Sequence, residues 1–450
     1  MDTASENKMG VMPVGKLLIT MSLPMMISMV VQALYNIVDS IFVSKISEDA
    51  LTAVSMAFPI QSICIALGAG MGVGVNALLS KSLGAKDKDM VNKSAMNGLF
   101  MTSVNYVILL LIGIFVVKPF YMIQTDSADI IQYGIDYLSV VCCFSFGIFF
   151  QFTFERLLQS TGRTFQTMIT QTIGAVTNII LDPIFIFGLF GVPKFGVKGA
   201  AIATVIGQIV AAILAFIFNL KVNTDINFSL KGFKPDFKII GMIYKVGLPS
   251  IIMQSIGSIM VFCLNKILIV FSSTAVAVFG VYFKLQSFVF MPVFGLNNGL
   301  IPIMAYNYGA KKKDRMLKTI KCGLLIAFSI MTVGMIVFEM FPDEILALFD
   351  ASDNMLAMGK IALRTIALHF PVAAICIVLG SAFQALGNAV YSMLVSIARQ
   401  LVVLIPAAYL LSLLGSVNYV WWCFPIAEVM SLIMTTIFFI KLKREVIDKI

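Results

Sequence analysis

The sequence contains little charge for its length. Asp, Glu, Lys and Arg make up 12% of its 450 residues, about half of the roughly 25% found in soluble globular domains. Hydrophobic residues make up 59%, and a mean hydropathy of +0.97 leaves too little polar surface to cover a protein in water. The composition therefore excludes a set of ordinary soluble domains and predicts that lipid surrounds most of the chain.

Histidine and paired cysteines are also scarce. His369 is the single histidine, and the seven cysteines are scattered through apolar runs without a CxxC spacing. A single histidine cannot form a metal site of several histidines, and the cysteines form no disulfide framework or zinc-ligand spacing. An integral membrane enzyme would need a catalytic constellation at a membrane face, which one histidine and unclustered loop acids do not provide. We therefore expect neither an enzyme nor a bound cofactor.

Long apolar runs recur along the whole chain. Each is close to the length of about 20 residues that an α-helix needs to cross a bilayer. They predict an all-α polytopic membrane protein with twelve transmembrane helices, at 15–43, 51–80, 94–118, 130–155, 164–190, 196–220, 240–266, 273–306, 316–341, 355–385, 389–414 and 417–440.

Basic residues are concentrated in alternate loops between these runs. With a cytoplasmic N-terminus, the inner side carries 23 Lys and Arg residues, including Lys231, and the outer side carries 7. Several acids, including Asp350, fall on the outer side. Because basic residues favour the cytoplasmic side, we expect a multi-pass protein of the cell membrane with both termini in the cytoplasm. The net charge of +9 is then a topology signal, and we expect no nucleic-acid partner.

The two halves of the sequence repeat each other at one fixed offset, which is half the length of the chain. The matches are Leu23-Pro24 with Leu248-Pro249, Leu83–Lys86 with Tyr308–Lys311, and Leu158–Gly162 with Phe383–Gly387. Self-similarity at one fixed offset indicates a structural repeat. The sequence therefore predicts two pseudo-symmetric six-helix bundles, an N-terminal lobe at 1–222 and a C-terminal lobe at 239–450, joined by a cytoplasmic linker at 223–238. Parallel repeats of this kind are typical of alternating-access transporters.

Several of these motifs, taken in order, resemble one transporter family. The loop Lys81–Asp89 lacks the arginines of the usual motif of the major facilitator fold. Instead, the repeated Leu-Pro, Gly-Ala-Lys and Gln-x-x-Gly motifs, with Asn178–Pro183 and Gly199–Thr204, resemble the MATE family, the multidrug and toxic compound extrusion transporters. The resemblance runs from Pro24 to the end of the twelfth span. It implies two six-helix lobes facing a central cavity, and export coupled to inward movement of Na+ or H+.

Two carboxylates lie within the predicted spans of the first half. Asp39 shares a helix face with Gln32 and Asn36, and Tyr35 lies beside them. Asp182 shares a face of span five with Gln171 and Asn178, because residues three or four apart lie on the same side of a helix. Ionisable groups at membrane depth are costly and indicate function.

A hydroxyl in span six reaches the same depth. At 1.5 Å per residue, Asp182 lies about 27 Å from the inner start of span five, and Thr204 about 12 Å from the outer start of span six. Two carboxylates, an amide and a hydroxyl provide oxygen ligands that suit Na+, and two crowded, desolvated carboxylates also suit a proton. The structural alternative is that Asp39 sits at the interface and that Asp182-Pro183 caps a helix kink.

The resemblance assigns a cation site to the first half. Asp39, Asn178, Asp182 and Thr204 match positions that bind the coupling cation in MATE transporters of this type, and we add Asn36 to this predicted site. The first four would be metal ligands only if Na+ is the coupling ion. Their counterparts at the repeat offset are apolar: Leu264, Val403 and Ala407 replace Asp39, Asn178 and Asp182. We therefore predict an ion site in the N-terminal lobe alone.

Three further charges fall near the membrane midplane of the second half. Lys284, Arg399 and Glu428 each lie about 15 Å or more into a predicted span. Charges at this depth are expected to avoid lipid, since each would cost about 2.5–3.5 kcal/mol there. We predict that Glu428 pairs with Lys284 or Arg399 in the lobe interior or cavity, and the alternative is a purely structural ion pair. The predicted substrate-cavity residues are Gln32, Tyr35, Gln171, Lys284, Arg399 and Glu428.

The function predicted from these features is secondary active efflux. We expect a monomer in the lipid bilayer that exports drugs or other amphiphilic, often cationic, small molecules in antiport with Na+ or H+. The 28 methionines and 37 phenylalanines can provide adaptable apolar cavity walls. The alternative within the same superfamily is a lipid-linked oligosaccharide flippase, which would need a more cationic cavity to bind pyrophosphate.

Overall fold

A computed structural model of the chain describes residues 6–229, 233–347, 349 and 352–450. These residues form helices and connecting segments and contain no β-strand. Residues 1–5 of the predicted N-terminal lobe, residues 230–232 of the predicted linker with Lys231, and Asp350 lie outside the described residues.

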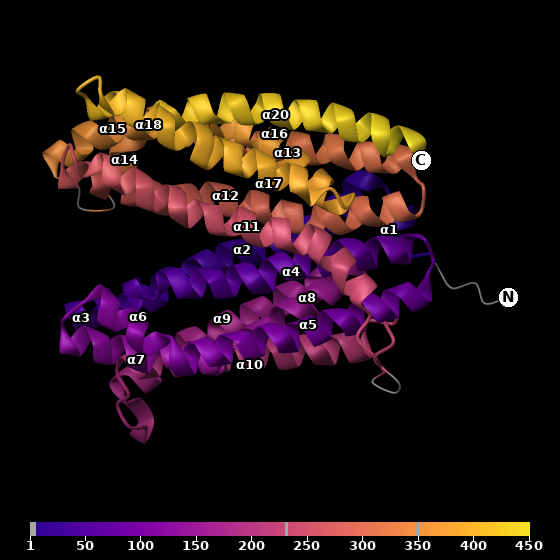
Figure 1. Cartoon of the computed structure of the whole chain (residues 1–450), viewed down its shortest axis with the longest axis horizontal. Coiled ribbons are helices and arrows are strands. Elements are labelled where there is room, and N and C mark those ends of the chain that lie inside the picture. Colours follow the sequence, from indigo (N-terminus) through magenta and orange to yellow (C-terminus); the bar gives the residue numbers. More distant parts are fainter. Residues whose placement is uncertain (1–5, 230–232, 348, 350–351) are drawn as a thin grey trace. The chain divides into compact units, whose positions relative to one another are not determined.

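The chain separates into two compact units (Figure 1). The first-half unit is Ile27–Gly247, and the second-half unit combines Met1–Met26 with Leu248–Ile450. The helix α2 (Val14–Ser44) contains Pro24 and contributes to both units, as does α11 (Phe237–Leu268), which contains Pro249. The lobe limits inferred from the repeat, 1–222, 223–238 and 239–450, remain a prediction.

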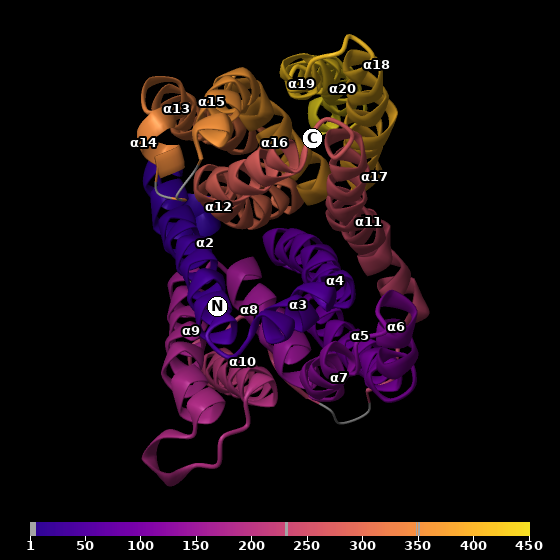
Figure 2. The same ribbon diagram turned by 90° about the vertical axis from the view of Figure 1, so that its left-hand side faces the viewer.

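The first-half unit is built from helices of α2 to α10 and the start of α11. The helices between these two are α3 (Glu48–Met56), α4 (Phe58–Gly84), α5 (Lys88–Phe115), α6 (Val117–Gln124), α7 (Ala128–Cys143), α8 (Phe146–Ser160), α9 (Thr164–Phe187), the 3-10 turn η1 (Leu189–Gly191) and α10 (Val197–Lys221). Figure 2 shows most of them nearly end-on.

The second-half unit repeats this order of long and bent helices. It contains α1 (Lys8–Val11), α12 (Ser273–Gly309), α13 (Lys313–Met340), α14 (Pro342–Ala347), α15 (Asp353–Ala367), α16 (Phe370–Ala385), α17 (Ala389–Ile397), the π-helix η2 (Ala398–Leu404), α18 (Ile405–Ser412), α19 (Val417–Val420), α20 (Cys423–Glu445) and the 3-10 turn η3 (Ile447–Lys449).

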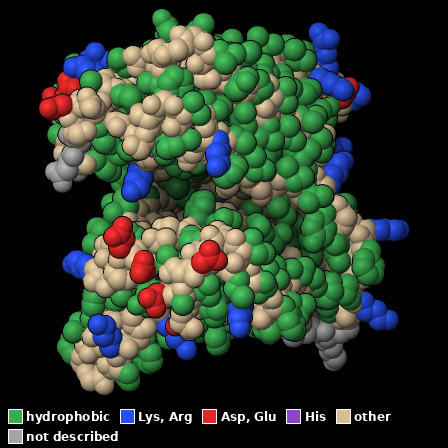
Figure 3. Space-filling model, turned by 60° about the vertical axis from the view of Figure 1, so that its left-hand side comes forward, with side chains coloured by type: hydrophobic (Ala, Val, Ile, Leu, Met, Phe, Trp, Pro, Cys, Tyr) green, Lys and Arg blue, Asp and Glu red, His purple; other side chains and the backbone are tan. Residues whose placement is uncertain are grey.

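The helices have the lengths and surfaces of membrane spans. Ten stretches of the described chain are long and apolar enough to cross a membrane, and two bent helix pairs bring the total to twelve. Apolar side chains such as Val107, Ile108 and Leu111 of α5 are exposed rather than packed, as expected where lipid is the solvent. Hydrophobic side chains cover most of the face shown in Figure 3. The prediction of an all-α polytopic membrane protein with twelve transmembrane helices is confirmed.

Several span boundaries differ from the sequence-based prediction. Span two begins at Phe58 rather than at residue 51, because Pro59 starts a new helix and α3 ends at Met56. Spans four and ten are each two helices, α7 with α8 bent by 42° and α15 with α16 bent by 45°. The breaks, at Phe144 and Leu368, are separated by nearly the repeat offset, so the bend belongs to the repeat.

The repeated motifs also adopt the same backbone conformation in both units. Lys86 and Lys311, at the ends of α4 and α12, have positive φ angles of 60° and 56°, and Gly162 and Gly387 have φ angles of 87° and 80°. Glycine is favoured in this left-handed region because it lacks a Cβ atom. The matching turns follow equivalent helices, so the sequence repeat corresponds to a repeat of local structure.

Candidate functional site

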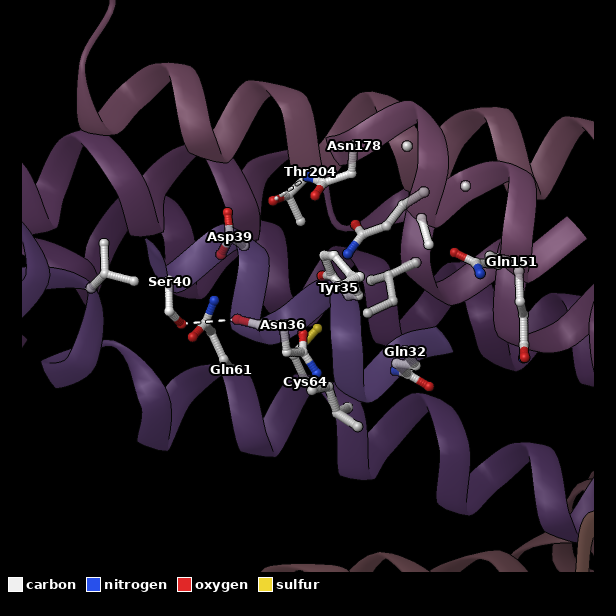
Figure 4. Close-up of a pocket in the computed structure, with 18 of the residues that line it drawn as sticks. Gln32, Tyr35, Asn36, Asp39, Ser40, Gln61, Cys64, Gln151, Asn178 and Thr204 are labelled. Carbon is white, nitrogen blue, oxygen red and sulfur yellow. Dashed lines mark hydrogen bonds between the residues drawn. The ribbon is translucent and has the colours of Figure 1, made fainter. Parts of the chain in front are cut away.

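A cavity of about 470 Å³ lies within the first-half unit (Figure 4). Helices α2, α3, α4, α7, α8, α9 and α10 contribute its walls, and amide and hydroxyl side chains are frequent among the lining residues. Asp39 is the one Asp or Glu among the described residues of the lining, and no Lys or Arg belongs to it. The cavity wall therefore combines apolar side chains with amide and hydroxyl groups, and a carboxylate is its acidic group.

Two glycines bring α9 and α10 together beside this cavity. The two helices lie side by side (Figures 1 and 2). A Cβ atom on Gly207 would lie 2.7 Å from the Gly174 carbonyl oxygen, and one on Gly174 would lie 3.0 Å from the Gly207 carbonyl oxygen. Small residues permit such close backbone approach between membrane helices. The polar side chains that follow Gly174 and precede Gly207 are therefore held within bonding distance.

Asn178 connects the polar residues of these two helices. Its side-chain amide lies 3.1 Å from the Thr204 hydroxyl, the contact drawn in Figure 4. In the amide orientation that satisfies all the groups, Nδ2 donates to Asp182 Oδ2 at 3.1 Å, and Oδ1 accepts from the Thr204 backbone N–H at 3.0 Å and from its hydroxyl at 3.1 Å. Asn178 and Asp182 are both buried. The amide thus bridges Asp182 and Thr204.

Asp39 of α2 completes this group. Its carboxyl group is within hydrogen-bonding reach of the Asp182 carboxyl group. In the described part of the chain, one oxygen of each carboxyl group, Oδ1, is buried and has no hydrogen-bond partner. Buried acceptors without a donor are costly. Two such oxygens on adjacent carboxyl groups fit a hard cation or a shared proton.

The other predicted residues of the first half lie on the cavity wall at different places. Gln32, Tyr35, Asn36 and Gln171 all line the cavity. Asn36 is exposed to it, and its backbone oxygen accepts a hydrogen bond from the Ser40 hydroxyl at 2.9 Å. No contact links the Asn36 side chain to the Asp39–Asp182 group within the described chain. Its place in the cation site remains a prediction.

A buried glutamate behind the cavity wall was missed by the sequence analysis. Glu155 is 1% exposed and accepts hydrogen bonds from Gln151, Thr170 and Gln171. Span four was predicted to end at residue 155, with Arg156 among the inner loop charges, but α8 continues to Ser160 and Arg156 is buried as well. Gln151 and Glu155 lie one helical turn apart, and this spacing could have indicated that the two side chains interact on one face of the helix.

Two of the three charged residues predicted in the second half form an ion pair with each other. Arg399 Nη1 lies 3.0 Å from Glu428 Oε2, so one of the two alternative pairings for Glu428 is confirmed. Arg399 belongs to the π-helix η2, a local distortion that is frequent at functional sites. Lys284 is exposed and forms no ion pair within the described residues. None of the three lines the cavity of the first-half unit.

Comparison with known proteins gives consistent matches along the whole chain. A family model described as MatE matches residues 24–184 and 249–410. Over 414 residues the chain is 27% identical to the multidrug export protein MepA of Staphylococcus haemolyticus (strain JCSC1435), which covers 92% of this chain and 90% of that protein. Over 421 residues it is 28% identical to MepA of Staphylococcus aureus (strain MRSA252), covering 92% and 91%. The two segments matched by the family model begin at Pro24 and Pro249, the same pair of residues that the internal repeat aligns.

Solved structures agree in fold over nearly the full length. An outward-facing multidrug resistance MATE family transporter of the MOP superfamily matches with a TM-score of 0.93 and 26% identity over 100% of both chains. A MOP superfamily transporter from Pyrococcus furiosus Vc1 (DSM3638), whose binding pocket is described as having reverse polarity that suggests a different function, matches with a TM-score of 0.89 and 26% identity over 98% of both chains.

Proposed function

Because this chain belongs to the MatE family, we propose that it exports amphiphilic, often cationic, drugs in antiport with Na+ or H+. It is a transporter rather than an enzyme, and it is a multi-pass membrane protein. We place it in the cell membrane as a monomer with both termini in the cytoplasm. This orientation follows from the excess of basic residues in the predicted inner loops.

The observation that carries the proposal is the charge of the cavity. Asp39 is its acidic residue, and the described lining contains no Lys or Arg. A carboxylate among amide and hydroxyl groups attracts a cation and has no fixed positive charge to repel it. The staphylococcal relatives are named multidrug export proteins, and this supports the same substrate class.

We assign the coupling ion to Asp39, Asn178, Asp182 and Thr204, with Asn36 nearby. The unpaired oxygens of Asp39 and Asp182 supply two acceptors, and Asn178 holds Asp182 and Thr204 at fixed separation. Na+ would bind these oxygens directly, and a proton would instead be shared by the two carboxyl groups. Either cation lowers the repulsion between the carboxylates, so its binding alters the packing of α2 against α9.

The transport cycle that we propose uses this change. A drug enters from the cytoplasm or the inner leaflet. The cation then binds from outside, alters the first-half unit and favours release of the drug to the exterior. Because drug and cation affinities are linked, each must weaken the binding of the other by the same factor.

A vesicle experiment tests the proposal and identifies the ion. Inside-out vesicles that contain the protein are incubated with a fluorescent cationic dye in the outer medium, under an imposed Na+ gradient or an imposed pH gradient, each alone. Dye uptake that requires one gradient and is absent from vesicles with the Asp182→Asn variant supports antiport through this site. Dye uptake that needs neither gradient would contradict it.

The alternative function, a lipid-linked oligosaccharide flippase, lacks a corresponding site in this cavity. Binding of a pyrophosphate group favours Lys or Arg side chains, and the described lining contains neither. No relative named above is described as a flippase. We therefore retain drug export as the proposed function.

A further inference from the structure

Glu155 is a buried carboxylate that the proposed ion site does not use. Its Oε1 accepts hydrogen bonds from Gln151 Nε2 at 3.0 Å and from Thr170 Oγ1 at 3.1 Å. Its Oε2 accepts one from Gln171 Nε2 at 2.7 Å. All three donors are neutral. Glu155 itself does not line the cavity, but Gln151 and Gln171 do, so the carboxylate lies directly behind two amides of the wall.

Arg156 is the neighbouring charge, and it lies against another helix. Its guanidinium donates to Gln159 at 2.8 Å, and its side chain packs on Gly72 of α4, where a Cβ atom would lie 2.7 Å from Arg156 Cγ. Glu155 instead contacts α9 through Thr170 and Gln171. The negative group of this pair is therefore the one that adjoins the cavity wall.

The contact with Glu155 determines how Gln171 presents its amide. Because Nε2 donates to the carboxylate behind the wall, the carbonyl oxygen Oε1 points away from Glu155. That oxygen is buried and has no hydrogen-bond partner in the described chain. A buried acceptor without a donor costs about 1–3 kcal/mol, and the terminal torsion of glutamine is broad. Because Gln171 lines the cavity, a small rotation that keeps the bond from Nε2 to Glu155 would expose Oε1 to a donor there.

This acceptor is separate from the ion site. Gln171 precedes Asn178 by seven residues on α9, which is about 10 Å along the helix axis. Figure 4 shows Gln151 and Asp39 toward opposite ends of the lining. A drug can therefore contact Gln171 without displacing the cation from Asp39 and Asp182.

We propose that Gln171 Oε1 accepts a hydrogen bond from the N–H-bearing cationic group of a drug, and that Glu155 is the positioning residue, because its bond to Nε2 keeps Oε1 on the opposite side of the amide. The inference rests on the proposed export function and adds to it a substrate class: cations that carry an N–H donor. Glu155 contributes in two ways, because it orients the amide and because its negative charge strengthens the acceptor in a desolvated site.

Replacing Glu155 with its own amide changes this arrangement without changing its size. Whichever way the amide of Glu155→Gln points, its NH2 group faces the NH2 group of Gln151 or the donor of Gln171. One wall amide must then turn, and it presents a donor where the cavity had an acceptor. The double variant Glu155→Gln with Gln171→Glu restores one donor facing one acceptor and returns the negative charge to the wall.

The test is equilibrium binding of three dyes to the purified full chain. Rhodamine 123 is a cation with N–H donors, tetraphenylphosphonium is a cation without them, and Nile red is neutral. We expect Glu155→Gln to weaken rhodamine 123 binding by about tenfold or more, to weaken tetraphenylphosphonium binding by a smaller factor, and to leave Nile red binding unchanged. The double variant should recover most of the rhodamine 123 affinity. Glu445→Gln, an exposed position in the second-half unit, is the matched control and should change none of the three.

Other outcomes overturn the inference. If Glu155→Gln weakens all three dyes equally, Glu155 only ties α8 to α9. If the two cations lose affinity equally, the charge of Glu155 acts without a hydrogen bond from the drug to Gln171. An absence of rescue in the double variant also contradicts the proposed geometry. Export is measured separately in vesicles. If the variants show the expected binding pattern but the wild-type protein exports none of the dyes, the proposed export function is refuted and the proposed role of Glu155 in binding is retained.

Discussion

The side-chain amide of Asn178 on α9 lies 3.1 Å from the Thr204 hydroxyl on α10. This contact exists because Gly174 and Gly207 let the two helix backbones approach. It joins one residue of span five to one of span six beside Asp182. The proposed cation site therefore depends on helix packing as much as on the ligands themselves.

The first prediction concerns the buried carboxylate of this group. Asp182→Asn should abolish ion-coupled dye efflux, since it removes a charge that the cation would neutralise, and it should leave the amount of protein in the membrane nearly unchanged. The measurement is dye efflux from cells, normalised to protein abundance. Asp39→Asn should also impair coupling. Wild-type efflux by the Asp182 variant would contradict the assignment of the ion site.

The second prediction separates the two possible ions. A hydroxyl can complete a Na+ coordination shell but adds little to a proton shared by two carboxyl groups. If Na+ is the coupling ion, Thr204→Ala should raise the Na+ concentration for half-maximal efflux by roughly threefold to tenfold, as expected for the loss of one contact. Thr204→Ser is the control, because it keeps the hydroxyl. An unchanged Na+ dependence in Thr204→Ala would exclude Thr204 as a Na+ ligand, and no Na+ dependence in the wild-type protein would indicate proton coupling.

The third prediction tests the glycine contact between α9 and α10. A Cβ atom at Gly207 would meet the Gly174 carbonyl oxygen at 2.7 Å and Asn178 Cβ at 3.2 Å. Gly207→Ala should therefore push the helices apart, lower the free energy of unfolding by about 1–3 kcal/mol and weaken ion coupling. Gly241→Ala in α11 is the matched control, because nothing lies within 4 Å of its added Cβ atom. Equal stability of the two variants would show that the close contact is unimportant.

The fourth prediction concerns the ion pair of the second half. Arg399→Met would leave the Glu428 carboxylate, whose side chain is 3% exposed, buried without its partner. Breaking a buried pair in this way costs about 3–5 kcal/mol, so protein abundance in the membrane should fall. Lys284→Ala should keep normal abundance, since Lys284 is exposed and has no ion pair in the described chain. Membrane fractions of the two variants are compared by immunoblot; a greater loss for the Lys284 variant would reverse this assignment.

The sequence alone determined the features that depend on local pattern. Twelve spans follow from apolar runs of sufficient length, because a helix that crosses lipid must be apolar over its whole span. The fixed offset between the two halves identified turns that the structure builds with the same left-handed residues, Lys86 and Lys311. Helical spacing also indicated that Asn178 and Asp182 share one face of α9.

Only the tertiary structure decided which side chains meet across helices. Spacing along one helix left open whether Lys284 or Arg399 pairs with Glu428, because the answer depends on how each helix is rotated about its axis. The bend between α7 and α8 contains no proline, so the residue that most often breaks a helix did not indicate it. The apolar pattern placed Glu155 at the end of a predicted span. Only the structure shows that Thr170 and Gln171 of α9 donate hydrogen bonds to it. A buried charge is defined by its partners, and these come from distant parts of the chain.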